Sequence, residues 1–159
     1  MKKLLVVLAL AISSSAFAQS GLKEDIDVVQ SLWGKDKKDM VSSYMKLAEP
    51  QASEFWKVYD NYEKERKTLG RKRWEILNDY LNNYDKLSEE KADDIAEATL
   101  KNNVSFEKLY QSYYSKTKKV IGNVNAAKFI QFEMGLATYI KAEQQSQTPF
   151  LGELDKSKK

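Results

Sequence analysis

Ser-x-x-Lys tetrapeptides are the segments of this chain whose residue types could do covalent chemistry. Five occur, among them those at residues 43–46, 105–108 and 115–118. Such a serine–lysine pair acts in penicillin-binding enzymes together with Ser-Asp-Asn and Lys-Thr-Gly elements, and both of these companions are missing. Because 23 of the 159 residues are lysines, matches of this kind arise by chance. We therefore predict that the chain is not an enzyme of this class.

The other common catalytic residue types are absent or badly spaced. The chain has no His and no Cys, which excludes catalytic triads, thiol nucleophiles and zinc sites built on imidazole or thiolate ligands. Neighbouring carboxylates such as Asp93 and Asp94 splay apart on a helix, so they make poor acid–base pairs. We expect no enzyme activity, no metal and no cofactor.

A short segment that contains all three arginines of the chain is the candidate binding surface. Arginine attracts acidic groups and stacks on aromatic rings, so cations mixed with apolar residues suit the binding of non-native protein. Under the alternative interpretation these charges are solvated and pair with Glu63, Glu65 and Glu75. The candidate client-binding residues are Arg66, Lys67, Leu69, Arg71, Arg73 and Trp74.

Residues 1–18 have the three regions of a secretory signal peptide. Lys2 and Lys3 precede an apolar run over 4–12, and residues 16–18 form a small-residue cleavage site. The run is much shorter than the roughly 20 residues that span a bilayer. We expect cleavage after Ala18, release into a bacterial periplasm, and no integral membrane segment in the mature chain. Without residues 1–18 the chain has 24 basic and 23 acidic residues, a balance that argues against nucleic-acid binding.

Downstream of the signal peptide, apolar residues recur at three- and four-residue spacings, which predicts an all-α protein of four helices. The first carries a stripe from Leu22 to Leu47 with a hinge expected at Gly34. The second is expected to run from Pro50 to Lys86, since proline is tolerated in a first helical turn. Its predicted seam contains Phe55, Tyr59, Tyr62, Arg66, Leu69, Arg73, Ile76, Tyr80 and Tyr84.

The third predicted helix begins at Ser88, whose hydroxyl is expected to cap it. Gly122 and Asn123 are expected to stop this helix, and Asn123 or Asn125 to cap the fourth. We interpret Asn102, at a buried position, as a device that fixes helix register. The predicted seams contain Ile95, Ala98, Asn102, Phe106, Leu109, Tyr113, Thr117 and Val120 in the third helix, and Ala126, Phe129, Phe132, Leu136 and Tyr139 in the fourth.

These elements predict one domain over 19–151, followed by a flexible tail at 152–159. The two longest helices are expected to form a central antiparallel hairpin, with the outer helices packed along it. A helix from residue 50 to residue 86 is about 55 Å long at roughly 1.5 Å per residue, so the molecule should be elongated.

Two short segments forty residues apart look like copies of one another: LAEPQ (47–51) and LSEEK (87–91). Together they resemble the paired Leu-Thr-x-x-Gln motif of the Spy/CpxP-like family of exported helical proteins. The first copy keeps Leu47 and Gln51 but lacks the hydroxyl, and the second keeps Leu87 and the Ser88 hydroxyl but lacks the glutamine. The segment FWKVYDNYE (55–63) also resembles a stretch found in a broader group of exported relatives.

The resemblance implies an ATP-independent periplasmic chaperone or envelope-stress protein that dimerises and holds unfolded clients on a cradle-shaped helical surface. A holdase acts by binding non-native states and needs no chemistry. The sequence agrees in having no Gly-rich phosphate-binding loop. It leaves open a second function, that of a periplasmic adaptor or regulator which docks one folded partner such as a sensor domain.

Overall fold

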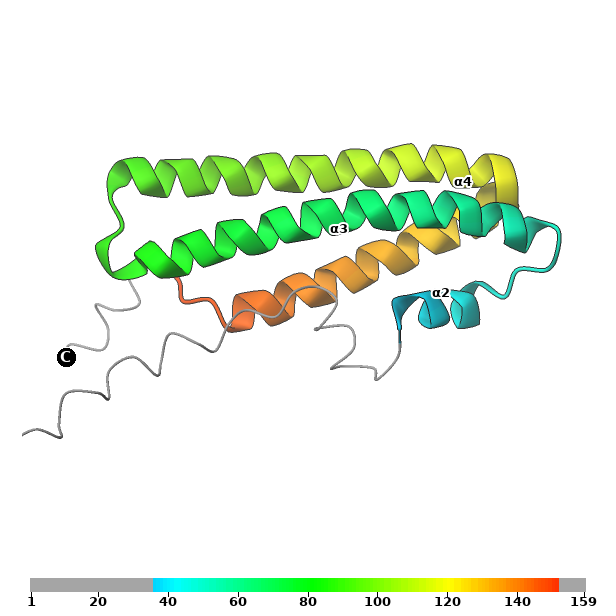
Figure 1. Ribbon diagram of the computed structural model, residues 1–159, viewed down its shortest axis with the longest axis horizontal. Coiled ribbons are helices and arrows are strands. Elements are labelled where there is room, and N and C mark those ends of the chain that lie inside the picture. Colours follow the sequence, from blue (N-terminus) through cyan, green and yellow to red (C-terminus); the bar gives the residue numbers. More distant parts are fainter. Residues whose placement is uncertain (1–35, 152–159) are drawn as a thin grey trace, which may run out of the picture.

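The computed structural model describes residues 36–151, and all its regular elements are helices (Figure 1). They are α2 (Lys37–Met45), α3 (Gln51–Asn83), the short 3₁₀ helix η1 (Tyr84–Lys86) and α4 (Glu89–Ser146). The all-α prediction is confirmed for this part of the chain. The signal peptide, most of the predicted first helix and the tail at 152–159 lie outside the described residues.

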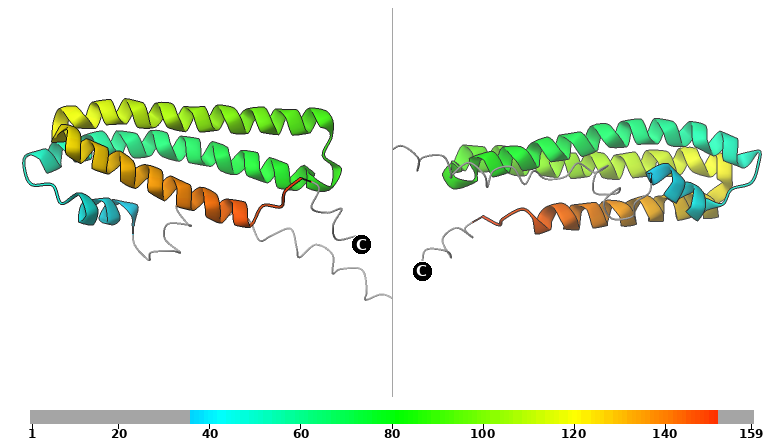
Figure 2. Two further views of the ribbon diagram at one scale, coloured as in Figure 1. Left: turned by 180° about the vertical axis from the view of Figure 1, so that it is seen from behind. Right: turned by 60° about the horizontal axis from the view of Figure 1, so that its bottom comes forward.

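The long helices lie side by side along most of their length (Figures 1 and 2). The first arm of α4 (residues 89–121) lies antiparallel to α3, and α4 then reverses so that its second arm (residues 123–146) runs back along the same helix. Short α2 lies against the second arm near this reversal. We call the end of the molecule at Gly122 the reversal end and the opposite end, at η1, the turn end.

The predicted number of four helices was wrong, because the structure has three α-helices within residues 36–151. The predicted third and fourth helices are the two arms of α4. The predicted stop at Gly122 is the place where the backbone leaves the helical conformation, with φ 78° and ψ 167°. Glycine fits this position because residues with a Cβ rarely adopt such a conformation. Asn125 does not act as the expected cap: its side-chain amide donates to the carbonyl of Ile121 across the break (3.2 Å).

The ends of α3 and the start of α4 agree with the predicted boundaries. Pro50 is the N-cap residue of α3, which ends at Asn83, and η1 continues the chain to Lys86. The hydroxyl of Ser88 accepts a hydrogen bond from the backbone N–H of Lys91 (3.2 Å), as a helix cap should. The predicted cap is therefore confirmed.

The core is densest in aromatic rings near the reversal end, where α2, α3 and both arms of α4 meet. The ring of Phe129 lies edge-on to Phe55 and Tyr62, with centroids 5.3 Å away from each, and Tyr62 contacts Tyr113 at 5.2 Å. Such edge-to-face pairs are favourable beyond the area they bury. The main buried cluster contains Val41, Met45, Phe55, Tyr59, Tyr62, Phe106, Leu109, Tyr110, Tyr113, Ile121, Ala126 and Phe129.

The second arm departs from its predicted seam in two places, at Glu133 and at Ile140, which are both buried although the seam did not include them. Tyr139, which the seam did include, is 47% exposed. The buried positions 126, 129, 133, 136 and 140 alternate steps of three and four, but position 133 is a glutamate, which interrupted the apolar pattern in the sequence.

Two sets of hydrogen bonds hold the long elements in register. Asn102 is buried, and its side-chain amide donates to the Leu69 carbonyl (3.1 Å), which joins the first arm to α3. At the turn end, the hydroxyl of Tyr80 donates to the carbonyl of Pro149 (2.8 Å) and that of Tyr84 to the carbonyl of Phe150 (2.7 Å). These bonds tie the chain that follows α4 to α3 and η1.

Candidate functional site

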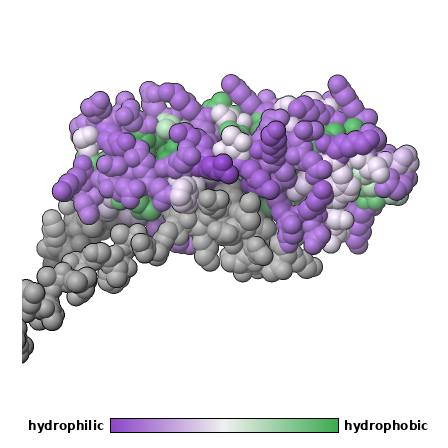
Figure 3. Space-filling view, in the orientation of Figure 1, coloured by the Kyte–Doolittle hydropathy of each residue, from purple (hydrophilic) through white to green (hydrophobic). Residues whose placement is uncertain are grey.

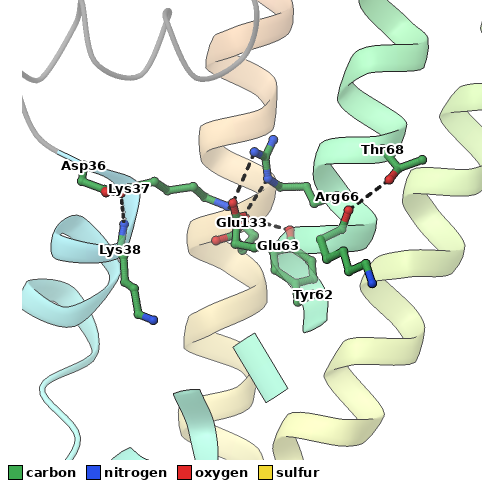
Figure 4. A network of polar contacts seen from close by, with 9 residues as sticks. Asp36, Lys37, Lys38, Tyr62, Glu63, Arg66, Thr68 and Glu133 are labelled. Atoms are coloured by element: carbon green, nitrogen blue, oxygen red, sulfur yellow. Dashed lines mark hydrogen bonds and ion pairs between the residues drawn. The ribbon is translucent and has the colours of Figure 1, made fainter. Parts of the chain in front are cut away.

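A buried group of charges joins α2, α3 and the second arm of α4 (Figure 4). The ammonium group of Lys37 contacts Oε2 of Glu133 at 2.7 Å and also binds Oε1 of Glu63. Nε of Arg66 donates to Oε1 of Glu63, and the hydroxyl of Tyr62 donates to Oε2 of Glu133, both at 2.7 Å. We call these five residues the charge cluster.

The charge cluster is removed from solvent, and two of its groups have shifted pKa values. The side chain of Glu133 is 2% exposed and that of Lys37 is 9% exposed. Burial by itself would raise the pKa of Glu63, but the adjacent Lys37 and Arg66 outweigh it and hold the pKa below its ordinary value. Burial and the neighbouring Glu133 raise the pKa of the Tyr62 hydroxyl well above 10.

Local sequence explains how the charge cluster is positioned. Asp36 caps α2 by accepting from the N–H of Lys38 (3.0 Å), which places Lys37 at the first residue of the helix. On α3, Glu63 and Arg66 are three residues apart and therefore adjacent on the helix surface. The second arm brings in Glu133 from 70 residues further along the chain than Glu63.

The charges of the cluster balance, with two cations against two carboxylates. Aromatic rings close it, since the ammonium group of Lys37 lies 5.2 Å from the ring centroid of Tyr62. A small cavity beside it is lined by four charged residues and by apolar and aromatic ones, among them Phe106, above whose ring the guanidinium of Arg73 lies at 4.9 Å. The arrangement can hold three helical segments together.

No cluster of three or more carboxylates within residues 36–151 is placed to bind a metal ion.

The structure divides the six candidate client-binding residues between different environments. Arg66 and Arg73 are buried, at 7% and 8% exposed, because both occupy the predicted seam of α3. Lys67 and Arg71 are exposed, whereas Leu69 and Trp74 are half-buried. The spacing of Lys67, Arg71 and Trp74 puts these three on one face of α3. The six residues therefore do not form a single open surface.

The four motif residues lie at opposite ends of the molecule, because α3 starts at the reversal end and α4 at the turn end (Figure 1). Leu47 packs on the core and Leu87 is half-buried, whereas Gln51 and Ser88 are exposed. Ala48 stands where the first copy lacks its hydroxyl. There Oε2 of Glu49 accepts from the hydroxyl (2.7 Å) and N–H (3.3 Å) of Ser53, so a carboxylate serves the start of α3.

An open groove between α3 and the first arm of α4 is a second candidate site, and sequence periodicity did not reveal it. Its lining includes two leucines, Leu69 and Leu109, together with hydroxyl groups and charges. The hydroxyl of Tyr113 donates to Glu65 at one wall (2.7 Å), and burial together with this carboxylate raises the pKa of Tyr113 to about 12. The other lining residues are Glu65, Thr68, Ser105, Lys108 and Ser112.

Large apolar side chains also stand exposed outside the groove. On the outer face of the first arm, Leu100 is 65% exposed and Val104 is 52% exposed. Val124, beside the reversal, is 82% exposed. The surface seen in Figure 3 is otherwise mainly hydrophilic, with apolar residues scattered over it.

Within residues 36–151, the helices carry too much charge and too little continuous apolar sequence for any of them to span a membrane. No protein-family model, no curated protein and no solved structure is significantly similar to this chain.

Proposed function

We propose that the protein is an ATP-independent holdase of the periplasm that binds non-native protein segments in the groove between α3 and the first arm of α4. The groove is the observation that carries the proposal. A non-native segment presents apolar side chains together with backbone amides that lack partners. The half-buried Leu69 offers apolar contact, with the buried Leu109 beneath it, and the hydroxyls of Thr68, Ser105 and Ser112 can donate and accept hydrogen bonds.

The predicted signal peptide and the resemblance to the Spy/CpxP-like family support the periplasmic setting and the chaperone class. On this proposal α3 and the first arm act as a long hairpin, and two copies associate so that their hairpins form a cradle. Light scattering on the purified protein tests the dimer, and a monomer at working concentration would contradict the cradle.

The groove is tested by diluting a chemically denatured model protein into buffer with and without this protein, at stoichiometric ratios and without nucleotide. We expect suppressed aggregation. Leu69→Gln should weaken the suppression while leaving the helical circular dichroism spectrum intact. Leu81→Gln is the matched control, because Leu81 is also half-buried on α3 but is not among the groove residues. Equal activity of both variants and the parent would remove the groove from the proposal.

The exposed cations of the candidate client surface need a separate test. Arg66 and Arg73 are buried, so their replacement would lower stability as well as binding. The double variant Lys67→Ser with Arg71→Ser changes exposed side chains only. If these cations attract acidic clients, the variant should bind them more weakly, and the loss should shrink as salt rises.

The second candidate function is that of an adaptor which docks one folded partner. The specific observation in its favour is the exposed pair Leu100 and Val104, four residues apart on one face of α4. A single partner bound in a fixed ratio, with binding lost in Val104→Asp and no suppression of aggregation, would favour the adaptor over the holdase.

A further inference from the structure

Charge is strongly segregated along the described chain. Residues 108–132 contain five lysines and no acidic residue. Residues 75–97 contain eight acidic residues and two lysines. The five lysines are Lys108, Lys116, Lys118, Lys119 and Lys128.

The fold places these two segments at opposite ends of the molecule. Residues 75–97 include the end of α3, η1 and the start of α4, which form the turn end (Figure 1). Residues 108–132 cover the last turns of the first arm and the first turns of the second, which meet at the reversal end. The connection from α2 to α3 and the first turns of α3 add Lys46 and Lys57 but also Glu49 and Glu54 at that end, so these four charges do not change the balance.

The lysines of the reversal end are available for an external partner. None of the five forms an ion pair with another residue of the described chain. The helix dipole favours cations near the last turn of the first arm. It does not account for Lys108, more than three turns before Gly122, nor for Lys128, which follows the reversal.

Aromatic and apolar groups share this surface with the cations. The ammonium groups of Lys116, Lys118 and Lys128 lie over the rings of Tyr113, Tyr114 and Tyr44, at 3.9, 5.5 and 4.6 Å from the centroids. Tyr44 is 40% exposed, and Val124, between Lys119 and Lys128 in sequence, is 82% exposed. Tyr113 is buried, but lysines together with the accessible rings of Tyr44 and Tyr114 and a projecting apolar residue are the composition that suits the headgroup region of a bilayer.

We propose that the reversal end binds an anionic lipid surface. The lysines supply attraction to the headgroups, and Val124 with Tyr44 and the half-buried Tyr114 supplies contact with the interface. Because the turn end is acidic, the same surface repels it, so the molecule stands on the membrane by its reversal end with the turn end directed away. This inference does not depend on the proposed holdase activity.

The test is sedimentation of the purified protein with vesicles of phosphatidylcholine alone and of phosphatidylcholine mixed with phosphatidylglycerol. We expect binding to the anionic vesicles only, weakening as salt rises. Each lysine near an anionic surface strengthens binding by roughly fivefold. The triple variant Lys116→Gln, Lys118→Gln, Lys119→Gln should therefore lose roughly 100-fold in affinity, because the three factors multiply.

The matched control is the triple variant Lys64→Gln, Lys72→Gln, Lys141→Gln, which removes the same charge from exposed positions outside residues 108–132. It should change affinity less than about twofold. Equal losses in the two triple variants would mean that only net charge matters and would overturn the assignment, as would equal binding to both kinds of vesicle. Binding of polyglutamate without binding of anionic vesicles would assign the surface to acidic proteins instead.

Orientation has its own readout, because the chain contains no cysteine and a single introduced one can be labelled uniquely. A polarity-sensitive dye on Val124→Cys should shift to the blue on anionic vesicles, and the same dye on Glu90→Cys at the turn end should not. A shift at Glu90 without one at Val124 would refute the proposed orientation.

Discussion

Replacing Lys37 by methionine tests whether the charge cluster holds α2 to the rest of the molecule. Methionine keeps the length and the apolar stem of the side chain but removes its charge. Glu63 and Glu133, whose side chains are 14% and 2% exposed, then face Arg66 as the one remaining cation of the cluster. A carboxylate left buried without its partner destabilises a protein by about 3–5 kcal/mol, and we expect a loss of this size for Lys37→Met.

The assay is urea unfolding followed by far-UV circular dichroism at neutral pH, with the slope of the transition compared between variants. Lys38→Met is the matched control, because its ion pair with Asp60 (2.9 Å) joins side chains that are 49% and 62% exposed. Exposed pairs contribute at most about 1 kcal/mol. If Lys37→Met loses no more stability than Lys38→Met, the charge cluster does not stabilise the fold.

A double variant separates charge balance from lost packing. Lys37→Met combined with Glu133→Gln restores one cation to one carboxylate, and the glutamine oxygen can still accept from the hydroxyl of Tyr62. We expect it to recover at least half of the stability lost in Lys37→Met, a clear departure from additivity. A double variant less stable than Lys37→Met alone would contradict the charge-balance argument.

The other predictions concern the reversal, the helix cap and pH. Gly122→Ala should lower the stability of the protein by about 1–3 kcal/mol because of the positive φ at this position. Gly135→Ala, with open space at its Cβ, should instead raise the stability by at most about 1 kcal/mol. Thermal unfolding compares the two variants, and equal effects would show that the positive φ does not matter. Ser88→Ala should cost about 1 kcal/mol by loss of the cap bond in the same measurement. Because the folded-state pKa of Glu63 lies below its ordinary value near 4.5, its contribution to stability is present above that pH and is lost as pH falls through the folded-state pKa. Acid unfolding of Glu63→Gln should therefore depend less steeply on pH than that of the parent. The pKa of Tyr62 is raised above 10, so stability should fall as pH rises beyond 10, and Tyr62→Phe should reduce that fall.

The helices were the most predictable part of this protein. All seven predicted seam residues from Phe55 to Ile76 are buried or half-buried. They were predictable because a repeat of three and four is a direct consequence of helix geometry. The cap at Ser88 and the break at Gly122 were predictable as well, since each depends on a single residue with a special backbone or hydrogen-bonding role.

The charge cluster was not predictable, because it joins residues far apart in sequence whose types usually mark solvent-exposed positions. Glu133 is a charge in an otherwise apolar seam, and only its distant partners Lys37 and Tyr62 make its burial favourable. The expectation that charged residues are exposed also led to the wrong prediction that Arg66 and Arg73 lie on an open surface, although both occupy positions of the predicted seam. A charge that coincides with a seam position was the signal that sequence analysis could have used.

The reversal at Gly122 is made by one residue, and this couples the rotational phase of the two arms of α4. A single residue added to the helix of the second arm between Gly122 and Phe129 would turn the rest of that arm by about 100° about its own axis. Phe129 would then leave the aromatic core, and Glu133 would lose both Lys37 and Tyr62. Evolution of this segment is therefore expected to proceed by substitution rather than by changes in length.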